Sequence, residues 1–234
     1  MITWLFPERC AVCKAPVLPR GALVHPVCSG RLKPIREPYC KGCGRALREE
    51  IKEYCEACEA TPPPWEAGRC LFPYQGEVGE TLRLVKREGT REFVRFFGEQ
   101  LLAECRLFFE RIRPDCIVPV PLHRTKLRSR GFNQAELLAR ELGRRTGIPV
   151  SMLLEKHKKT KDQKLLTGRE RRKNLRHAFT VSEGFAKKES PQTVLLLDDV
   201  LTTGSTLSAC TETLRQYGVR HIYVICICVG SAEG

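Results

Sequence analysis

Four pairs of metal-binding side chains follow one another at regular spacing near the N-terminus. They read CAVC, HPVC, CKGC and CEAC, with 11 residues between successive pairs. A tetrahedral zinc ion takes four soft or borderline ligands, and two knuckles of this kind supply two ligands each. The spacing therefore predicts one zinc site from the first two pairs and another from the last two. The first set is Cys10, Cys13, His25 and Cys28, and the second is Cys40, Cys43, Cys55 and Cys58.

Three alternatives to this assignment are open. Other pairings of the knuckles satisfy the same spacing, and reduced core thiols would need no metal. If His25 is only a surface residue beside Pro26, the first site is weak or empty. We expect structural zinc, because each site has four protein ligands and so short a module needs such a staple to fold. The remaining cysteines lack metal spacing and are expected to be small buried hydrophobic residues. They are Cys70, Cys105, Cys116, Cys210, Cys226 and Cys228.

A second group of reactive residues lies in LLLDDVLTTGST, residues 195–206. The leucines predict a buried strand, and Asp198 and Asp199 come at its carboxyl end, where open α/β sheets bind their ligands. The loop then enters a helix N-terminus, whose backbone N–H groups and hydroxyls hold phosphate, and glycine allows close approach. This loop is Thr202, Thr203, Gly204, Ser205 and Thr206. The combination fits a phosphate next to a cis-diol, as in a ribose 5-phosphate. The alternative is an ordinary capped turn.

Positive charge is concentrated in two short segments of a chain whose formal net charge is +13. Residues 124–130 hold four basic side chains and no acid, and residues 156–176 hold ten Lys or Arg against two acids. Localised positive charge indicates an anionic partner, such as phosphate, pyrophosphate or nucleic acid, and the alternative is a solvated face. The sequence contains no run of 18 or more apolar residues, so it predicts no membrane span. The N-terminal MITWLFPERC is too short and too soon interrupted to be a signal peptide, so we expect a cytoplasmic protein.

The rest of the pattern predicts the elements that must position these groups. Strands alternate with helices after the proline-rich stretch 61–68, which indicates a parallel sheet in an α/β domain. We predict a domain boundary there, between residues 1–62 and 63–234. The expected extended segments are 70–78, 115–121, 150–156, 177–181, 193–199 and 221–229. The expected helices are 81–88, 92–112, 133–145 and 204–217. Residues 122–131 are expected to be a basic loop, and 156–176 a long mobile loop.

Residues 195–206 also resemble the motif by which type I phosphoribosyltransferases bind phosphoribosyl pyrophosphate (PRPP). A wider resemblance covers nearly the whole chain. The zinc module, FPYQGEV, VPVPLHRTKLRSRGFNQAELLAR, LTGRERRKNLRHAF and DDVLTTGST together resemble the ComF (ComFC) family of competence-associated bacterial proteins. The chain departs from that family at His25, where cysteine is usual, and in its lysine-rich KHKKTKDQ. The resemblance implies a type I phosphoribosyltransferase-like parallel sheet with flanking helices, preceded by a small double zinc-ribbon domain.

The resemblance also implies a role for each part of the site. Asp198 and Asp199 would contact the ribose hydroxyls, residues 202–206 the 5-phosphate, and Mg²⁺ would bridge the diphosphate and hydroxyls. An early loop, residues 121–130, would receive the pyrophosphate, and segment 156–176 would close over the site and exclude water. Candidate pyrophosphate donors are Arg124, Lys126, Arg128 and Arg130, and candidate contacts in the closing loop are Lys159, Lys161, Arg169 and Arg172.

Two functions are compatible with these features. One is Mg²⁺-dependent transfer of a phosphoribosyl group from PRPP to an unknown acceptor. No general base is recognisable, but loss of pyrophosphate needs electrostatic stabilisation more than proton transfer. The other is a non-catalytic, single-stranded-DNA-binding accessory of DNA uptake that reuses the fold. The resemblance implies a role in natural transformation and partners among competence proteins, while the few aromatic residues among the basic ones argue against base stacking.

Overall fold

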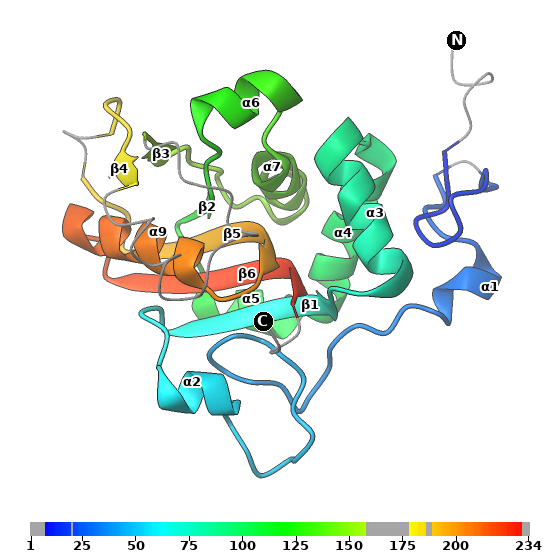
Figure 1. Ribbon diagram of the computed structural model, residues 1–234, viewed down its shortest axis with the longest axis horizontal. Helices are drawn as coiled ribbons and strands as arrows, with labels where there is room; N and C mark the ends of the chain where they lie inside the picture. The colour runs from blue at the N-terminus through cyan, green and yellow to red at the C-terminus, as the bar shows by residue number, and fades with distance from the viewer. Residues whose placement is uncertain (1–7, 20, 158–177, 186–188, 231–234) are drawn as a thin grey trace.

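A four-stranded parallel sheet forms the centre of the structure, a computed structural model that describes residues 8–19, 21–157, 178–185 and 189–230 (Figure 1). Its strand order is β1-β6-β5-β2. The strands are β1 (Ala67–Pro73), β2 (Cys116–Pro119), β5 (Thr193–Leu201) and β6 (His221–Val229). All three neighbouring pairs run parallel, so their carboxyl ends meet at one edge of the sheet.

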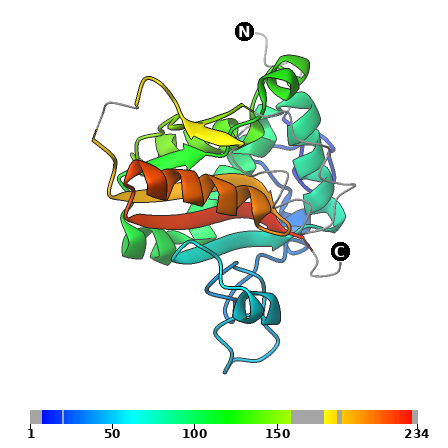
Figure 2. The same ribbon diagram turned by 60° about the vertical axis from the view of Figure 1, so that its left-hand side comes forward.

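Helices and a small antiparallel pair of strands cover the two faces of this sheet (Figure 1, Figure 2). One face is packed by α3 (Gly76–Glu88), α4 (Arg91–Glu104), α5 (Arg106–Ile112) and α7 (Gln134–Thr146). The other carries α9 (Ser205–Tyr217) and the antiparallel pair β3 (Leu154–Lys156) and β4 (Phe179–Val181). The short helix α6 (Arg124–Arg130) follows β2, and α1 (Pro26–Ser29) and α2 (Glu56–Ala60) belong to the cysteine-rich segment.

The run of leucines in β5 is buried on both sides. Successive residues of a strand point to opposite faces. Leu195 and Leu197 accordingly pack in the core under α4 and α7, whereas Val194 and Leu196 pack in the core under α9. All four are fully buried. A parallel sheet with both faces covered explains why this strand is a continuous apolar run rather than an alternating one.

The cysteine-rich segment packs directly on the sheet domain. Ile35, between the two predicted zinc sites, donates its backbone N–H to the carbonyl of Leu71 at 2.7 Å and so extends the free edge of β1. Trp65, in the predicted connector 61–68, is only 6% exposed. Trp65 therefore packs in the core, whereas Thr61, Pro62 and Glu66 of the same stretch are exposed. The boundary between residues 1–62 and 63–234 stays a prediction.

Two of the predicted helical and loop segments differ from the structure. The prediction of a basic loop over 122–131 is wrong, because residues Arg124–Arg130 form the helix α6. The His123 side chain caps this helix by accepting a hydrogen bond from the N–H of Thr125 at 3.2 Å. The single helix predicted for 92–112 is broken at Cys105, whose φ of −117° is not helical, and so gives α4 and α5.

Two of the predicted extended segments also differ. The stretch 70–78 is extended only to Pro73, and α3 begins at Gly76, because Gly76 takes the positive φ of 53° that starts the turn into the helix. Of residues 150–156 only Leu154–Lys156 form a strand, and that strand pairs with β4 outside the parallel sheet. The long mobile loop predicted for 156–176 lies, apart from Lys156 and His157, outside the described residues. Within the described part of the chain, no helix is long and apolar enough to cross a membrane.

Candidate functional site

A cavity of about 840 Å³ opens at the carboxyl ends of β5 and β2. Its size lies within the range of small-molecule binding sites, roughly 300–1,000 Å³. Most of its lining comes from the end of β5 with its following loop, the segment from β2 into α6, and helix α3, and Lys14 and Lys156 add to it. Asp198, Asp199 and every residue from Thr202 to Thr206 line it. The structure thus brings the predicted acidic pair and the predicted phosphate loop into one cavity.

The two aspartates reach the cavity from opposite faces of β5. Asp198 lies on the side of α9, with Lys156 and Cys210 as charged or titratable neighbours, and Asp199 lies on the side of α3. The N–H of Asp199 donates to Oδ1 of Asp198 at 2.8 Å. Burial, and next the charge of Asp199, raise the pKa of Asp198 to about 8. A ligand that donates hydrogen bonds to the pair would stabilise its charged form.

Lys86 on α3 completes the acidic pair. Its Nζ lies 3.0 Å from Oδ2 of Asp199 and 5.8 Å from the ring centroid of Tyr74. Burial opposes the charge on Lys86, yet the facing carboxylates of Asp199 and Asp198 raise the pKa of its ammonium group. The sequence reasoning missed this residue. A signal was present, because Lys86 follows the buried Leu82 by four positions and so falls on the apolar face of α3.

The predicted phosphate loop is held in the shape that the sequence suggested. The end of β5 is fixed by the N–H of Gly230, which donates to the carbonyl of Leu201 at 2.8 Å. Gly204 is the N-cap of α9 and has a φ of 73°, a conformation that favours glycine. The hydroxyls of Thr203 and Ser205 lie 2.9 Å apart. The first turn of a helix has N–H groups without intrahelical partners, and at α9 this turn adjoins the cavity.

The four predicted pyrophosphate donors separate into two pairs. Lys126 and Arg130 line the cavity, whereas Arg124 and Arg128 are not among its lining residues. Arg124 lies 3.6 Å from Glu155 instead, and Arg128 is exposed. They point away because residues 124–130 form a helix, which distributes consecutive side chains around its axis.

Two further cavity residues come from the same side, and neither was predicted. His123 lines the cavity, and its Nε2 lies 3.0 Å from the carbonyl oxygen of His157. Lys156 also lines it, and burial lowers the pKa of its ammonium group. The predicted contacts of the closing loop lie outside the described residues. These are Lys159, Lys161, Arg169 and Arg172.

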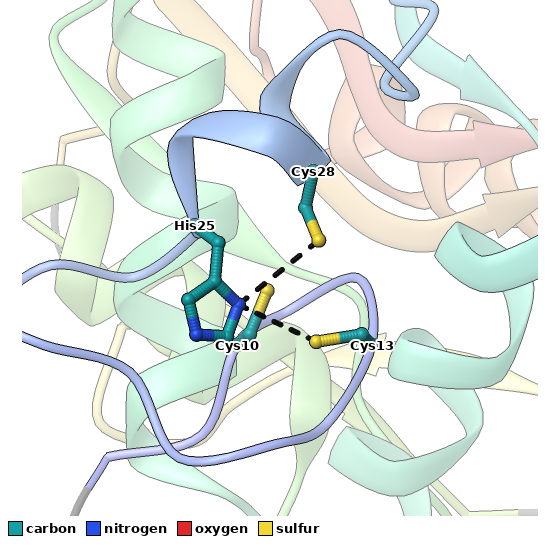
Figure 3. Close-up of side chains that lie close together, drawn as sticks. All are labelled: Cys10, Cys13, His25 and Cys28. Carbon is teal, nitrogen blue, oxygen red and sulfur yellow. Dashed lines mark hydrogen bonds between the residues drawn. The ribbon is translucent and has the colours of Figure 1, made fainter.

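The first cysteine-rich cluster brings Cys10, Cys13, His25 and Cys28 together (Figure 3). Nδ1 of the histidine lies 3.4 Å from Sγ of Cys13 and 4.0 Å from Sγ of Cys28, with the three sulfur atoms gathered around it (Figure 3). Its Nε2 lies 3.0 Å from the carbonyl of Pro16. A histidine ligand is commonly oriented by such a hydrogen bond from its second nitrogen. His25 therefore points its Nδ1 into the cluster, which argues against the alternative that it is only a surface residue beside Pro26.

Lys14 ties this first cluster to helix α3. Its Nζ donates to the carbonyls of Ala11 at 2.7 Å and Glu77 at 3.4 Å, and it also contacts the hydroxyl of Thr81. The Thr81 hydroxyl in turn donates to the carbonyl of Ala11. Because Lys86 lies on the same helix, the first cluster helps to hold the wall of the cavity that carries the partner of Asp199.

The second cluster brings Cys40, Cys43, Cys55 and Cys58 together, in the pairing of knuckles that the spacing suggested. In both clusters all ligand atoms lie within 4.8 Å of one another. Four ligands at zinc–sulfur distances of about 2.3 Å would lie about 3.8 Å apart, and Sγ of Cys43 and Cys55 are 3.7 Å apart. Both sets therefore fit a tetrahedral ion with no open position, which makes the zinc structural.

Hydrogen bonds within each cluster shift the pKa of its thiols in opposite directions: those with Cys40 raise the pKa of Cys43 and Cys58, while one thiol of each cluster is shifted down. Burial acts to raise the pKa of Cys10, but backbone hydrogen bonds from Cys13 and His25 outweigh it and lower that pKa to about 6. Hydrogen bonds from the Cys43 and Cys58 thiols hold the pKa of Cys40 well below its usual range. Thiolates are the form that binds zinc. The six cysteines outside the clusters are all buried.

Known proteins resemble both parts of the chain. Residues 1–59 match the family model of the double zinc ribbon domain, and residues 127–233 match that of the phosphoribosyl transferase domain. Competence protein F of Haemophilus influenzae Rd is 33% identical over 211 residues, which cover 85% of this chain and 88% of that protein. These matches and the parallel sheet confirm the predicted fold class, a type I phosphoribosyltransferase-like domain after a zinc ribbon.

Two further relatives match over most of their length. The DNA utilization protein YhgH of Escherichia coli K12 is 28% identical over 227 residues, which cover 95% of this chain and 97% of that protein. Competence protein ComFC of Bacillus subtilis 168 is 28% identical over 206 residues, which cover 82% of this chain and 77% of that protein. The similarity thus extends across both the ribbon and the sheet domain.

The zinc assignment predicts the effect of removing one ligand. Cys40→Ser and Cys55→Ser should each release one zinc ion per chain and destabilise the cysteine-rich segment, because a structural site folds with its metal. Elemental analysis of the purified variants measures this. Cys105→Ser, which changes a buried cysteine outside both clusters, is the control and should retain both ions. An unchanged zinc content in the ligand variants would refute the assignment.

The ion pair of Lys86 with Asp199 predicts a coupled effect on stability. Lys86→Met should lower the free energy of unfolding by about 3 kcal/mol at neutral pH, because it leaves a buried carboxylate without its cation. The double variant Lys86→Met/Asp199→Asn should recover most of that loss, as urea unfolding of the wild type, Lys86→Met, Asp199→Asn and the double variant would show. Lys86→Arg, which retains the charge, is the control. Additive losses in the double variant would contradict the pairing.

Proposed function

Since the chain belongs to the ComF (ComFC) family, we propose that it binds PRPP together with Mg²⁺ in this cavity, transfers a phosphoribosyl group to an acceptor, and acts in DNA uptake during natural competence. One observation carries the proposal. Asp198 and Asp199 lie in the same cavity as the Thr202–Thr206 loop at the N-terminus of α9. A pair of hydrogen-bond acceptors beside a phosphate-binding turn suits a ribose 5-phosphate.

The phosphate end of the ligand would lie on the first turn of α9. The loop contributes the hydroxyls of Thr203 and Ser205, and Gly204 takes the positive φ of 73° with which the turn enters the helix. The backbone N–H groups and the helix dipole favour an anion at this point. The ribose hydroxyls would then donate to the carboxylates at the end of β5.

The diphosphate end would face the segment from β2 into α6. Lys126 and Arg130 line that side of the cavity, and their charges would stabilise the negative charge that develops on the departing pyrophosphate. The cavity offers carboxylate oxygens, which are the ligand type that Mg²⁺ prefers, so its residues fit this ion. Mg²⁺ would neutralise part of the charge of the diphosphate.

The reaction that these groups favour is substitution at C1 of the ribose. Asp198 and Asp199 would hold the sugar while the bond from C1 to the pyrophosphate oxygen breaks and the acceptor attacks the same carbon. Positive charge then develops on the ribose and negative charge on the leaving group. Both are stabilised by charges already in place, which is the main source of catalysis in such a site.

The cellular part of the proposal is supported by the relatives. Two of them are competence proteins, of Haemophilus influenzae and Bacillus subtilis, and a third is a DNA utilization protein of Escherichia coli. The match extends over most of each protein. We therefore place the PRPP-dependent activity of this chain in the handling of incoming DNA.

Calorimetric titration of Mg-PRPP into the protein tests the proposed site. The wild type should bind saturably, and Asp198→Asn/Asp199→Asn should weaken binding by at least about 100-fold, because each lost charge-assisted hydrogen bond contributes about 1.5–3 kcal/mol. Glu212→Gln removes one carboxylate from an exposed position of α9 and should bind like the wild type. Wild-type protein that does not bind Mg-PRPP would overturn the proposal.

Binding of single-stranded DNA is a second candidate function, and the charge of the chain favours it. The net charge is +13, and ten basic residues fall within 156–176. A PRPP site needs only a few cations, so the others are available for a DNA backbone. This function does not depend on catalysis in the cavity, and the two can coexist.

The salt dependence of binding tests this second function. If the basic segment contacts phosphates, the logarithm of the affinity for single-stranded oligonucleotide should fall with the logarithm of salt concentration by about 0.7 for each phosphate contacted. Reversing the charge of Arg169, Arg171 and Arg172 to Glu should weaken binding and make that slope shallower. A flat response to salt in fluorescence anisotropy would exclude the function.

A further inference from the structure

The phosphate loop rests on an indole ring that comes from outside the sheet. Trp65 lies between the second cysteine cluster and β1 and is 6% exposed. A Cβ built on Gly204 would lie only 3.2 Å from Cη2 of this indole. The ring therefore occupies the space that a side chain at the N-cap of α9 would enter, next to the turn to which we assign the 5-phosphate.

The other end of the same ring is attached to the second zinc site. Nε1 of Trp65 donates to the carbonyl of Gly42 at 2.7 Å, and this hydrogen bond is buried. Gly42 stands between the zinc ligands Cys40 and Cys43. One side chain thus joins the knuckle of a metal site to the phosphate loop.

The knuckle itself lies against the backbone of β1 with no side chain between them. The N–H of Gly68 donates to the carbonyl of Lys41 at 2.9 Å. A Cβ on Gly68 would come within 2.4 Å of the carbonyl oxygen of Gly42, and a Cβ on Gly44 within 2.2 Å of the backbone nitrogen of Cys70. Because the knuckle and the backbone of β1 are in such close contact, a displacement of the knuckle would displace β1 as well.

The backbone on either side of Trp65 is held independently of the metal. Arg215, in the last turn of α9, donates to the carbonyl of Pro64 at 3.2 Å and to the carboxylate of Glu66 at 3.0 Å. Glu66 also accepts from the N–H of Ile222 at 2.7 Å. These bonds anchor the main chain around Trp65 to α9 and β6. The hydrogen bond to the Gly42 carbonyl therefore acts on the orientation of the indole ring and not on the position of the backbone.

We propose that Trp65 is a positioning residue through which the second zinc site holds the Thr202–Thr206 loop in its phosphate-binding shape. Zinc bound by Cys40, Cys43, Cys55 and Cys58 fixes the carbonyl of Gly42, that carbonyl orients the indole, and the indole supports Gly204. The first zinc site supports α3 instead and does not contact this loop through Trp65. The proposal rests on the proposed function for its ligand, though not for the coupling itself.

Hydrogen exchange of the loop amides tests the coupling without any ligand. Trp65→Phe removes the indole donor and the Cη2 contact and leaves all zinc ligands in place. It should retain two zinc ions per chain, while the amides of residues 202–206 exchange about tenfold faster. Phe97→Leu shortens a fully buried ring on α4 and is the control for general loss of stability, with loop exchange unchanged.

The zinc-site variants separate the two metal sites. Cys58→Ser should raise the exchange of residues 202–206, whereas Cys13→Ser, at the first site, should leave it unchanged. If Trp65→Phe retains wild-type exchange in this loop, the proposal is overturned even where Cys58→Ser fails to fold. Faster exchange together with no binding of Mg-PRPP to the wild type would uphold the coupling and overturn the proposed function.

Binding of the two halves of the ligand tests the position of the effect. Trp65→Phe should weaken binding of ribose 5-phosphate about fivefold, as expected from the loss of one supporting hydrogen bond, and leave binding of pyrophosphate unchanged. A general structural role would weaken both probes alike. Equal losses for ribose 5-phosphate and pyrophosphate would therefore overturn the assignment of Trp65 to the phosphate loop.

Discussion

The placing of two adjacent carboxylates at the end of β5, Asp198 half-buried and Asp199 buried, is the constraint on which the site depends. Carboxylates are rarely buried without a partner, because desolvation penalises their charge. Here Asp199 has the ammonium group of Lys86 at 3.0 Å, and the pKa of Asp198 is raised to about 8. The strand alone cannot supply this compensation, since its other residues near the pair are apolar. A helix from elsewhere in the chain must bring the cation to within hydrogen-bond distance.

That requirement explains the position of the cysteine-rich segment. Helix α3 carries Lys86, and Lys14 and Thr81 attach the first cluster to this helix. The second cluster lies under β1 and reaches the phosphate loop through Trp65. Each cluster thus borders a different wall of the same cavity. The ribbon therefore contacts elements that surround the cavity as well as folding its own short segment.

The parts of the site that the sequence predicted are those whose chemistry depends on neighbouring residues in the chain. The zinc knuckles repeat at a fixed interval, and the acidic pair, the loop and the helix N-terminus follow one another within residues 195–217. Local geometry determines these arrangements, so the motif and the spacing were sufficient. Prediction was poorer where a side chain's direction depended on an unrecognised element. Arg124 and Arg128 are the example, because α6 turns them away from the cavity that Lys126 and Arg130 line.

The sequence by itself determined the class of fold, the two sets of metal ligands, and the strand, acidic pair and loop that form one wall of the cavity. Only the tertiary structure decided what faces that wall. Lys86, Lys14 and Trp65 lie more than a hundred positions before the loop. The spacing of Lys86 from Leu82 indicates that it faces the core, but no local pattern indicates what it meets there. Lys86 faces the wall because α3 follows the carboxyl end of β1, and the carboxyl ends of parallel strands lie at one edge of the sheet. Trp65 precedes β1 and approaches Gly204 by packing in the core under α9. The packing of the sheet sets that proximity, and no local pattern encodes it.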